Sequence, residues 1–226
     1  MWDSVEMGPG RDVLGELAGA VRERGMKLGA STHYAFDWKY YTHSDEFDTN
    51  DLRFSGLYGK PHGPEEPACR EFLDHWYAIV IDIIDKYQPD IPWFDFGFNG
   101  PEFETCRKKI AAYYYNKGFE WDKEVVLNYK KKAFPDGTAV LDLERGKLGQ
   151  IRFMVWQMDT SISKKSWGHI NGDEFKTVDS LADDLVDIVS KNGVLLLNVG
   201  PGADGTIPDE ARDILIGIGK WLDSNG

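Results

Sequence analysis

Segments with the apolar periodicity of a helix alternate along this chain with short apolar segments that suit β-strands. A strand that is followed by a helix and then by another strand is typical of a mostly parallel α/β sheet. The periodicity predicts helices at residues 11–23, 69–87, 102–117, 178–190 and 209–222. The short apolar segments predict strands at residues 26–31, 91–95, 124–128, 139–143, 153–156 and 194–199.

The number of predicted strands limits the architecture. A closed barrel of alternating strands and helices needs about eight strands, and five or six can be recognised here. The fold class we predict is therefore α/β, a (β/α)8-barrel-like fold that is incomplete or open. No internal repeat, low-complexity tract or linker divides the sequence, so we expect residues 1–226 to form a single truncated barrel domain.

Charge and composition exclude several classes of partner. The formal net charge is −12, and the only dense basic run is Lys130-Lys131-Lys132, which argues against nucleic acids and anionic membrane surfaces. No stretch reaches the roughly 20 apolar residues of a membrane helix. The first residues lack the pattern of a signal peptide, which predicts a cytoplasmic protein. Cys69 and Cys106 are too few for a disulfide framework, so we interpret them as buried thiols, with a single disulfide as the alternative.

The most informative polar residue is Asp95, which ends the apolar segment at residues 91–95 and has aromatic neighbours on both sides. Glycines follow at once, and a barrel presents catalytic side chains at such strand ends. An Asp at this position can also simply cap a helix or pair with a cation. A long loop at residues 32–66 follows the preceding predicted strand and brings His33, Tyr34 and Trp38, which we expect on the same face as Asp95.

Two later segments carry similar chemistry. Glu144 belongs to the segment DLERG, which lies at the end of a short strand-like run, and Asp142 in the same segment is a competing carboxylate. The other segment, WQMDTS, begins with Trp156. Aromatic rings stack on the apolar face of a sugar while short polar side chains bind its hydroxyls, so this mixture predicts a carbohydrate pocket. Core packing remains the alternative for Trp156, and a surface position the alternative for His33 and His169.

Together these segments resemble a known family. The stretches WQMDTS, SWGH, KNGVLLLNVGPGADGTIP and IGKWLDSNG resemble the closing half of the catalytic domain of α-L-fucosidases, glycoside hydrolase family 29. Upstream, WDSVEMGPGRD, WFDF and LDLERG resemble, in the same order, a turn before a barrel helix, the nucleophile strand and the acid/base segment.

The resemblance implies a retaining exo-acting α-L-fucosidase whose partner is a fucosylated oligosaccharide or glycoside. Asp95 corresponds to the nucleophile and Glu144 to the general acid/base, which in a retaining enzyme lie about 5 to 5.5 Å apart. The sugar contacts are then expected from His33, Tyr34, Trp38, Trp93, Trp156 and His169. No metal or other cofactor is implied.

Some family features are absent from this sequence. The first barrel strands, their paired-histidine motif and the C-terminal β-sandwich have no counterpart in it. An open sheet leaves apolar edges exposed, so we expect a homo-oligomer in which a neighbouring subunit covers them. The alternative function is a carbohydrate-binding remnant that no longer positions both carboxylates.

Overall fold

The computed structural model describes residues 3–226, and the chain falls into two compact units, Met1–Ala139 (unit 1) and Val140–Gly226 (unit 2). Trp2, which opens the segment WDSVEMGPGRD, lies outside the described residues. That residues 1–226 act as one domain stays a prediction, and each unit is described below by itself.

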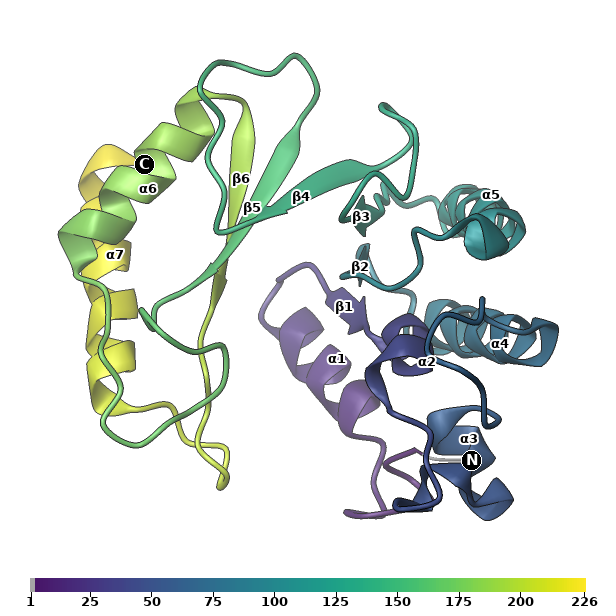
Figure 1. The fold of residues 1–226 in the computed structure, drawn as a ribbon. Helices are drawn as coiled ribbons and strands as arrows, with labels where there is room; N and C mark the ends of the chain where they lie inside the picture. Colours follow the sequence, from purple (N-terminus) through teal and green to yellow (C-terminus); the bar gives the residue numbers. More distant parts are fainter. Residues whose placement is uncertain (1–2) are drawn as a thin grey trace. The chain divides into compact units, whose positions relative to one another are not determined.

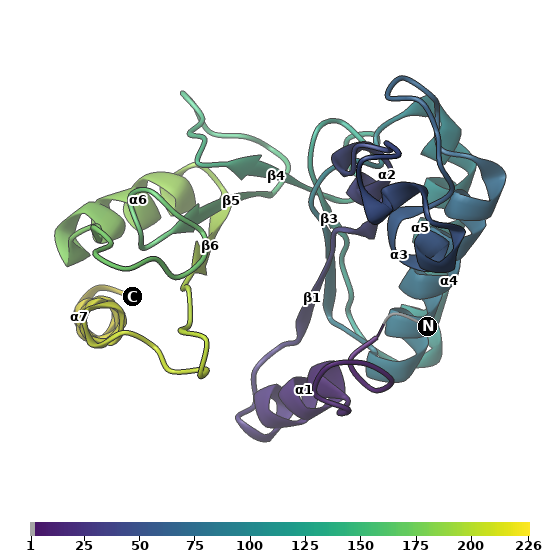
Figure 2. The same cartoon turned by 60° about the horizontal axis from the view of Figure 1, so that its bottom comes forward.

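Unit 1 contains three parallel strands in chain order: β1 (Gly29–Thr32), β2 (Ile91–Phe94) and β3 (Asn128–Tyr129). Its long helices are α1 (Val13–Glu23), α4 (Arg70–Tyr87) and α5 (Glu104–Glu120). Helices α4 and α5 lie side by side along one face of these strands (Figures 1 and 2). The segment between β1 and α4 forms the short helices η1 (Tyr34–Phe36), α2 (Asp37–Tyr40), η2 (Asp48–Asn50), η3 (Leu52–Phe54) and α3 (Ser55–Tyr58).

Aromatic side chains fill the space between β2 and the helices of unit 1. Trp76 of α4 contacts the rings of Phe94, Phe98 and Phe103, with centroid separations of 6.2, 6.0 and 5.2 Å. Phe94 is the last residue of β2 and faces this core. Because side chains alternate along a strand, its neighbours Trp93 and Asp95 point to the opposite face.

Unit 2 also has three parallel strands, β4 (Val140–Glu144), β5 (Trp156–Ser161) and β6 (Gly193–Asn198). The helices α6 (Val178–Ser190) and α7 (Asp209–Asn225) lie along one face of these strands (Figure 1). Trp156 and Met158 of β5 form a buried cluster with Ile188 of α6. The alternate residues of β5, which are Gln157, Asp159 and Ser161, therefore lie on the other face.

The observed elements agree with most predicted ranges but differ at two strands. The strand predicted at residues 124–128 is reduced to Asn128 and Tyr129, and Lys131 and Lys132 then leave the ladder with φ angles of 55°. In place of the strand predicted at residues 153–156, the structure has β5 at Trp156–Ser161, so the two ranges share only Trp156. Residues 152 and 153 are instead held by Asn192, whose Nδ2 donates to both of their carbonyls at 3.2 and 3.0 Å.

Cys69 and Cys106 are both free thiols, and Cys106 is buried as predicted, whereas Cys69 is only partly buried. None of the helices in residues 3–226 is long and apolar enough to cross a membrane. A cytoplasmic location stays a prediction.

Candidate active site

Three polar side chains follow the ends of the three strands of unit 1. In the parallel ladder Thr32 is level with Phe94, and Phe94 with Tyr129. The next residue along each strand is His33, Asp95 or Lys130. Equal register and equal direction place these three side chains at one level on one face of the sheet.

Both oxygens of the Asp95 carboxylate have a nitrogen partner. His33 Nε2 lies 3.0 Å from Oδ2, and Lys130 Nζ lies 2.8 Å from Oδ1. The Asp95 and Lys130 side chains are only 9% and 5% exposed, whereas the His33 side chain is 54% exposed. Solvent therefore reaches this group mainly on the histidine side.

The surroundings keep Asp95 ionised. Burial by itself raises the pKa of this carboxyl group, but the hydrogen bonds from His33 and Lys130 and the lysine charge outweigh burial and lower the pKa below its ordinary value. A carboxylate that stays charged in a desolvated setting is suited to act as a nucleophile.

Trp93 lines the same face, two residues before Asp95. The Lys130 ammonium lies 5.0 Å from the Trp93 ring centroid, and the His33 ring meets Trp93 edge-on at 5.8 Å. Ser31 Oγ lies 3.2 Å from His33 Nδ1, so the second ring nitrogen of His33 also has a hydrogen-bond partner. Asp95 thus sits beside an aromatic wall and two nitrogen donors.

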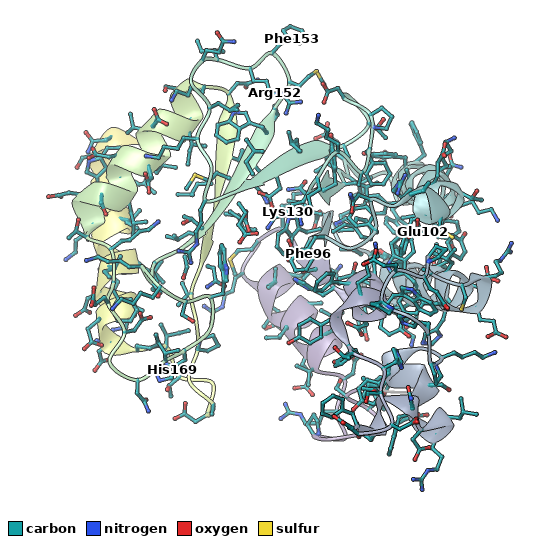
Figure 3. All side chains as sticks on the ribbon, in the orientation of Figure 1. Phe96, Glu102, Lys130, Arg152, Phe153 and His169 are labelled. Atoms are coloured by element: carbon teal, nitrogen blue, oxygen red, sulfur yellow. The ribbon has the colours of Figure 1, made fainter. Side chains whose placement is uncertain are left out.

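A glycine holds the loop after β2 against the loop after β1. Gly97 has a φ of 91°, and a Cβ built on it would lie 2.6 Å from the Phe36 Cα. Phe36 and Phe96 also pack edge-on, with centroids 4.5 Å apart. Only glycine allows this approach, which ties the Asp95 segment to the His33 segment. Figure 3 labels Phe96 and Lys130 in this region of unit 1.

Tyr34 and Trp38 occupy the long loop, where their rings pack against other aromatic side chains of the loop and of α4. Tyr34 stacks on Phe72 at 5.0 Å, and the buried Trp38 stacks on His62 at 3.7 Å. The Trp38 indole nitrogen also donates to the Glu66 carbonyl at 2.8 Å. These contacts give both residues a supporting role in the loop, and a direct sugar contact stays a prediction.

In unit 2 the predicted acid/base, Glu144, lies at a strand end. It ends β4, is exposed, and is level with Asp159 of β5. Asp142, two residues earlier on the same face, is buried and accepts a hydrogen bond from Gln157 Nε2 at 3.0 Å. Of the two carboxylates that the sequence left in competition, Glu144 is exposed and Asp142 is buried.

The loop that follows β5 is anchored to the end of β6. Asn198 Nδ2 donates to the Trp167 carbonyl at 2.7 Å, and Gly200 approaches Gly168 and His169 so closely that a Cβ would lie 2.8 Å from both backbones. The exposed Trp167 and His169 are thereby fixed at this end of β6. Figure 3 shows His169 and Phe153 at opposite ends of unit 2.

Trp156 lies at the other end of β5, because it is the first residue of that strand. Its side chain is fully buried between Met158 and Ile188, and its indole nitrogen donates to the Lys191 carbonyl at 3.0 Å. This position matches the core-packing alternative for Trp156 rather than a sugar contact.

The site contains residues that the sequence patterns did not single out. Lys130 was notable only as part of a basic run, because the predicted strand at residues 124–128 ended two residues before it. Arg145, directly after Glu144, carried no signal of its own. Within residues 3–226 no group of three His, Cys, Asp or Glu side chains could hold a metal ion, and the absence of a cofactor stays a prediction.

Comparison with known proteins places this geometry in a family. The family model for alpha-L-fucosidase matches residues 1–226. The tissue alpha-L-fucosidase of Rattus norvegicus is 27% identical over 230 residues, which cover 100% of this chain and 46% of the relative. The tissue alpha-L-fucosidase of Homo sapiens is 28% identical, with the same shares. The chain thus spans about half the length of these relatives.

Among solved structures, the Thermotoga maritima alpha-fucosidase in complex with fucose is 32% identical with a TM-score of 0.76, over 99% of this chain and 47% of that one. The same enzyme with a mechanism-based inhibitor is 34% identical with a TM-score of 0.75, over 97% and 47%. This likeness confirms the predicted fold class, an incomplete (β/α)8-barrel-like fold. The chain belongs to the alpha-L-fucosidase family of glycoside hydrolases.

Proposed function

We propose that this chain carries the catalytic chemistry of a retaining, exo-acting α-L-fucosidase. The observation that carries the proposal is Asp95, a buried carboxylate that stays ionised at a strand end because His33 and Lys130 each hold one of its oxygens. Membership of the alpha-L-fucosidase family supports fucose as the sugar. The substrate is a terminal α-L-fucosyl group on an oligosaccharide or another glycoside.

In the first step Asp95 attacks the anomeric carbon of the fucosyl group. Its carboxylate oxygen forms a covalent bond to that carbon while the bond to the leaving oxygen breaks. Glu144, in its protonated form, gives its proton to the leaving oxygen. Lys130 and His33 orient the nucleophile throughout, because each donates to a carboxylate oxygen.

In the second step Glu144 acts as a base. It takes a proton from water, the water oxygen bonds to the anomeric carbon, and Asp95 leaves as a carboxylate. Two inversions give net retention. This mechanism requires the two carboxyl groups to come within about 5 to 5.5 Å of each other.

Sugar recognition is proposed for residues around each carboxylate. His33 and Trp93 lie beside Asp95, and His33 is exposed enough to bind a hydroxyl group. Near Glu144, the exposed ring of Trp167 offers a face on which a sugar can stack, and His169 is two residues further on.

The test compares release of 4-nitrophenol from 4-nitrophenyl α-L-fucopyranoside by the wild-type chain and by Asp95→Gly. We expect turnover by the wild type and a loss on the order of 10³-fold or more in the variant. Added azide should restore nitrophenol release in Asp95→Gly and yield the β-fucosyl azide, because azide attacks the anomeric carbon from the side that Asp95 occupied.

Asp90→Asn is the matched control. Asp90 is also buried in unit 1 and paired with lysines, with Lys123 Nζ 3.1 Å from its Oδ1, but it directly precedes β2 and so lies at the opposite end of that strand. This variant should lose stability and keep turnover per folded molecule. An inactive wild type that still binds fucose would instead support the carbohydrate-binding remnant.

Glu144 is tested by its leaving-group dependence. Glu144→Gln should slow cleavage of a fucosyl disaccharide about 10²- to 10⁴-fold, and cleavage of a dinitrophenyl fucoside much less, because that leaving group needs no proton. Asp159→Asn and Asp142→Asn provide the comparison. The acid/base assignment moves to Asp159 if only that variant shows the selective loss.

A further inference from the structure

The residue directly after Glu144 has an unusual backbone. Arg145 has a φ of 47°, in the left-handed region, although Gly146 follows it and could have taken that conformation without steric strain. A non-glycine residue keeps such a conformation only where its surroundings hold it, and such positions gather at functional sites.

Backbone bonds fix Arg145 to the neighbouring strand. Its N–H donates to the Asp159 carbonyl at 2.9 Å, and the Gly146 N–H donates to the Leu143 carbonyl at 3.3 Å. The left-handed residue therefore makes the last backbone bond from β4 to β5, and the next N–H turns back to β4 itself. The main chain of Glu144 is held on both sides as a result.

The Arg145 side chain reaches from this strand end to the loop that carries Trp167. Its guanidinium carbon lies 4.6 Å from the Trp167 ring centroid. One terminal nitrogen donates to the Lys164 carbonyl at 3.2 Å, and the other lies 3.5 Å from the Ser166 carbonyl. A planar guanidinium suits this set of a ring face and two carbonyls, and an ammonium group does not.

The loop at the far end of these contacts is itself ordered. Ser163 Oγ accepts from the Ser166 N–H at 2.8 Å and donates to Asp173 Oδ1 at 2.9 Å. Asn198 holds the Trp167 carbonyl from the side of β6. Arg145 thus joins two ordered parts, the end of β4 and a loop anchored to β6.

We propose that Arg145 is a positioning residue that holds the acid/base Glu144 and the Trp167 ring in a fixed relation to each other. This inference rests on the proposed function, in which Glu144 supplies and removes the proton. The contacts of the arginine are to neutral carbonyls and a ring, so its part is geometric. Its loss should weaken proton transfer to the leaving group more than it weakens attack by Asp95.

Three variants separate the contributions of Arg145. Arg145→Ala removes the side chain, Arg145→Lys keeps the charge without the planar fork, and Arg145→Gly removes the side chain while relaxing the backbone. Lys164→Ala is the matched control, because it removes an exposed cation from the same loop and leaves the carbonyl acceptor in place.

The measurement is kcat/KM on a fucosyl disaccharide and on a dinitrophenyl fucoside, with thermal unfolding of each variant. We expect Arg145→Ala and Arg145→Gly to lose about 10²-fold on the disaccharide, which is the scale of an ångström-sized misplacement, and less than about tenfold on the dinitrophenyl substrate. Arg145→Lys should recover only part of the loss. Arg145→Gly should unfold at the wild-type temperature or above while remaining impaired, which a merely structural role would not produce.

Equal losses on both substrates, or full activity in all three variants, would overturn this inference while leaving the proposed function in place. Losses that follow the unfolding temperature across the series would also overturn it. An inactive wild type would overturn the proposed function itself, and the assignment of Arg145 with it.

Discussion

Lys130 is buried, and its ammonium group lies between the Asp95 carboxylate and the Trp93 ring. A buried charge is tolerated only with a partner, so each member of the Lys130–Asp95 pair depends on the other. At the scale of single residues this pair decides the protonation state of the proposed nucleophile.

Replacing Lys130 by Met should therefore raise the pKa of Asp95, because the effect of burial is then opposed only by His33. The acidic limb of the kcat/KM–pH profile should move to higher pH. Removal of one partner of a buried pair should also destabilise the fold by roughly 3 to 5 kcal/mol. Both are measurable, by initial rates across pH and by urea unfolding.

The pH dependence of stability has a defined sign. A lowered folded-state pKa means that Asp95 stabilises the protein above its ordinary pKa, and that this contribution is lost as the pH falls through the lowered value. In Lys130→Met this acid-dependent loss should shrink. Lys131→Met is the control, since Lys131 is exposed and lies 5.3 Å from the Phe96 ring; a similar shift there would contradict the assignment.

Asp37 behaves in the opposite way. Burial raises the pKa of this half-buried carboxyl group to about 6, against a partly compensating effect of His33. Its contribution to stability is therefore complete below its ordinary pKa and lost as the pH rises through about 6.

Asp37→Asn should accordingly raise the melting temperature relative to wild type above about pH 6, and the difference should fade in acid. Thermal unfolding across pH checks this, with the exposed Glu46→Gln in the same loop as control. A constant difference at all pH values would mean that the substitution acts by another route.

Residues differ in how far the sequence reveals them. Asp95 could be predicted because an acid that ends an apolar segment before glycines is a local signal. Lys130 could not, because its neighbours Lys131 and Lys132 hide it in a run of like residues, and only the ladder register shows that it is level with Asp95. Arg145 depends on a backbone angle that no residue pattern reports.

At the scale of elements, the loops that follow the strands are held by close backbone contacts. Gly97 shows this most clearly, since the loop after β2 touches the Phe36 backbone there. The bounds of α6 were predicted from its apolar face alone. The bounds of β5 were not predicted, because Gln157, Asp159 and Ser161 interrupt its apolar pattern. That these three residues share one face becomes clear only once the strand is placed in the sheet.

Gly97→Ala should lower both stability and activity. The left-handed φ of 91° alone costs about 1–2 kcal/mol for a residue with a Cβ, and the contact with Phe36 adds to it because that backbone must move. We expect at least a tenfold fall in kcat/KM as the Asp95 loop shifts, on the scale known for small misplacements.

Gly25→Ala separates strain from contact. Gly25 has a φ of 68°, and a Cβ added there would meet no atom within 4 Å, so only the backbone strain applies. Urea unfolding and initial rates on both variants give the difference. Equal effects in the two would show that the approach of Gly97 to Phe36 has no energetic importance.

At the scale of the whole molecule, β6 is the last strand in the order of the sheet and exposes Val194 and Leu196. Apolar side chains at a strand edge favour pairing with another chain. The predicted homo-oligomer therefore remains our expectation. Sedimentation should show a mass that increases with protein concentration in the micromolar range.

Leu196→Glu should shift this equilibrium toward the monomer, because a charge at a strand edge opposes pairing. Phe119→Glu is the control, since Phe119 is an exposed apolar side chain that belongs to helix α5 of unit 1 and not to β6. A strictly monomeric wild type would refute self-association.

The level placement of His33, Asp95 and Lys130 after three strand ends also limits how this chain can change during evolution. One residue inserted within β2 would turn Asp95 toward the helices and bring an aromatic ring to its place, since the faces of a strand alternate. A residue inserted after the strand end would leave the face intact. Segments such as residues 41–66 should therefore vary in length among descendants of this chain. Each of the three residues should stay directly after the end of its strand.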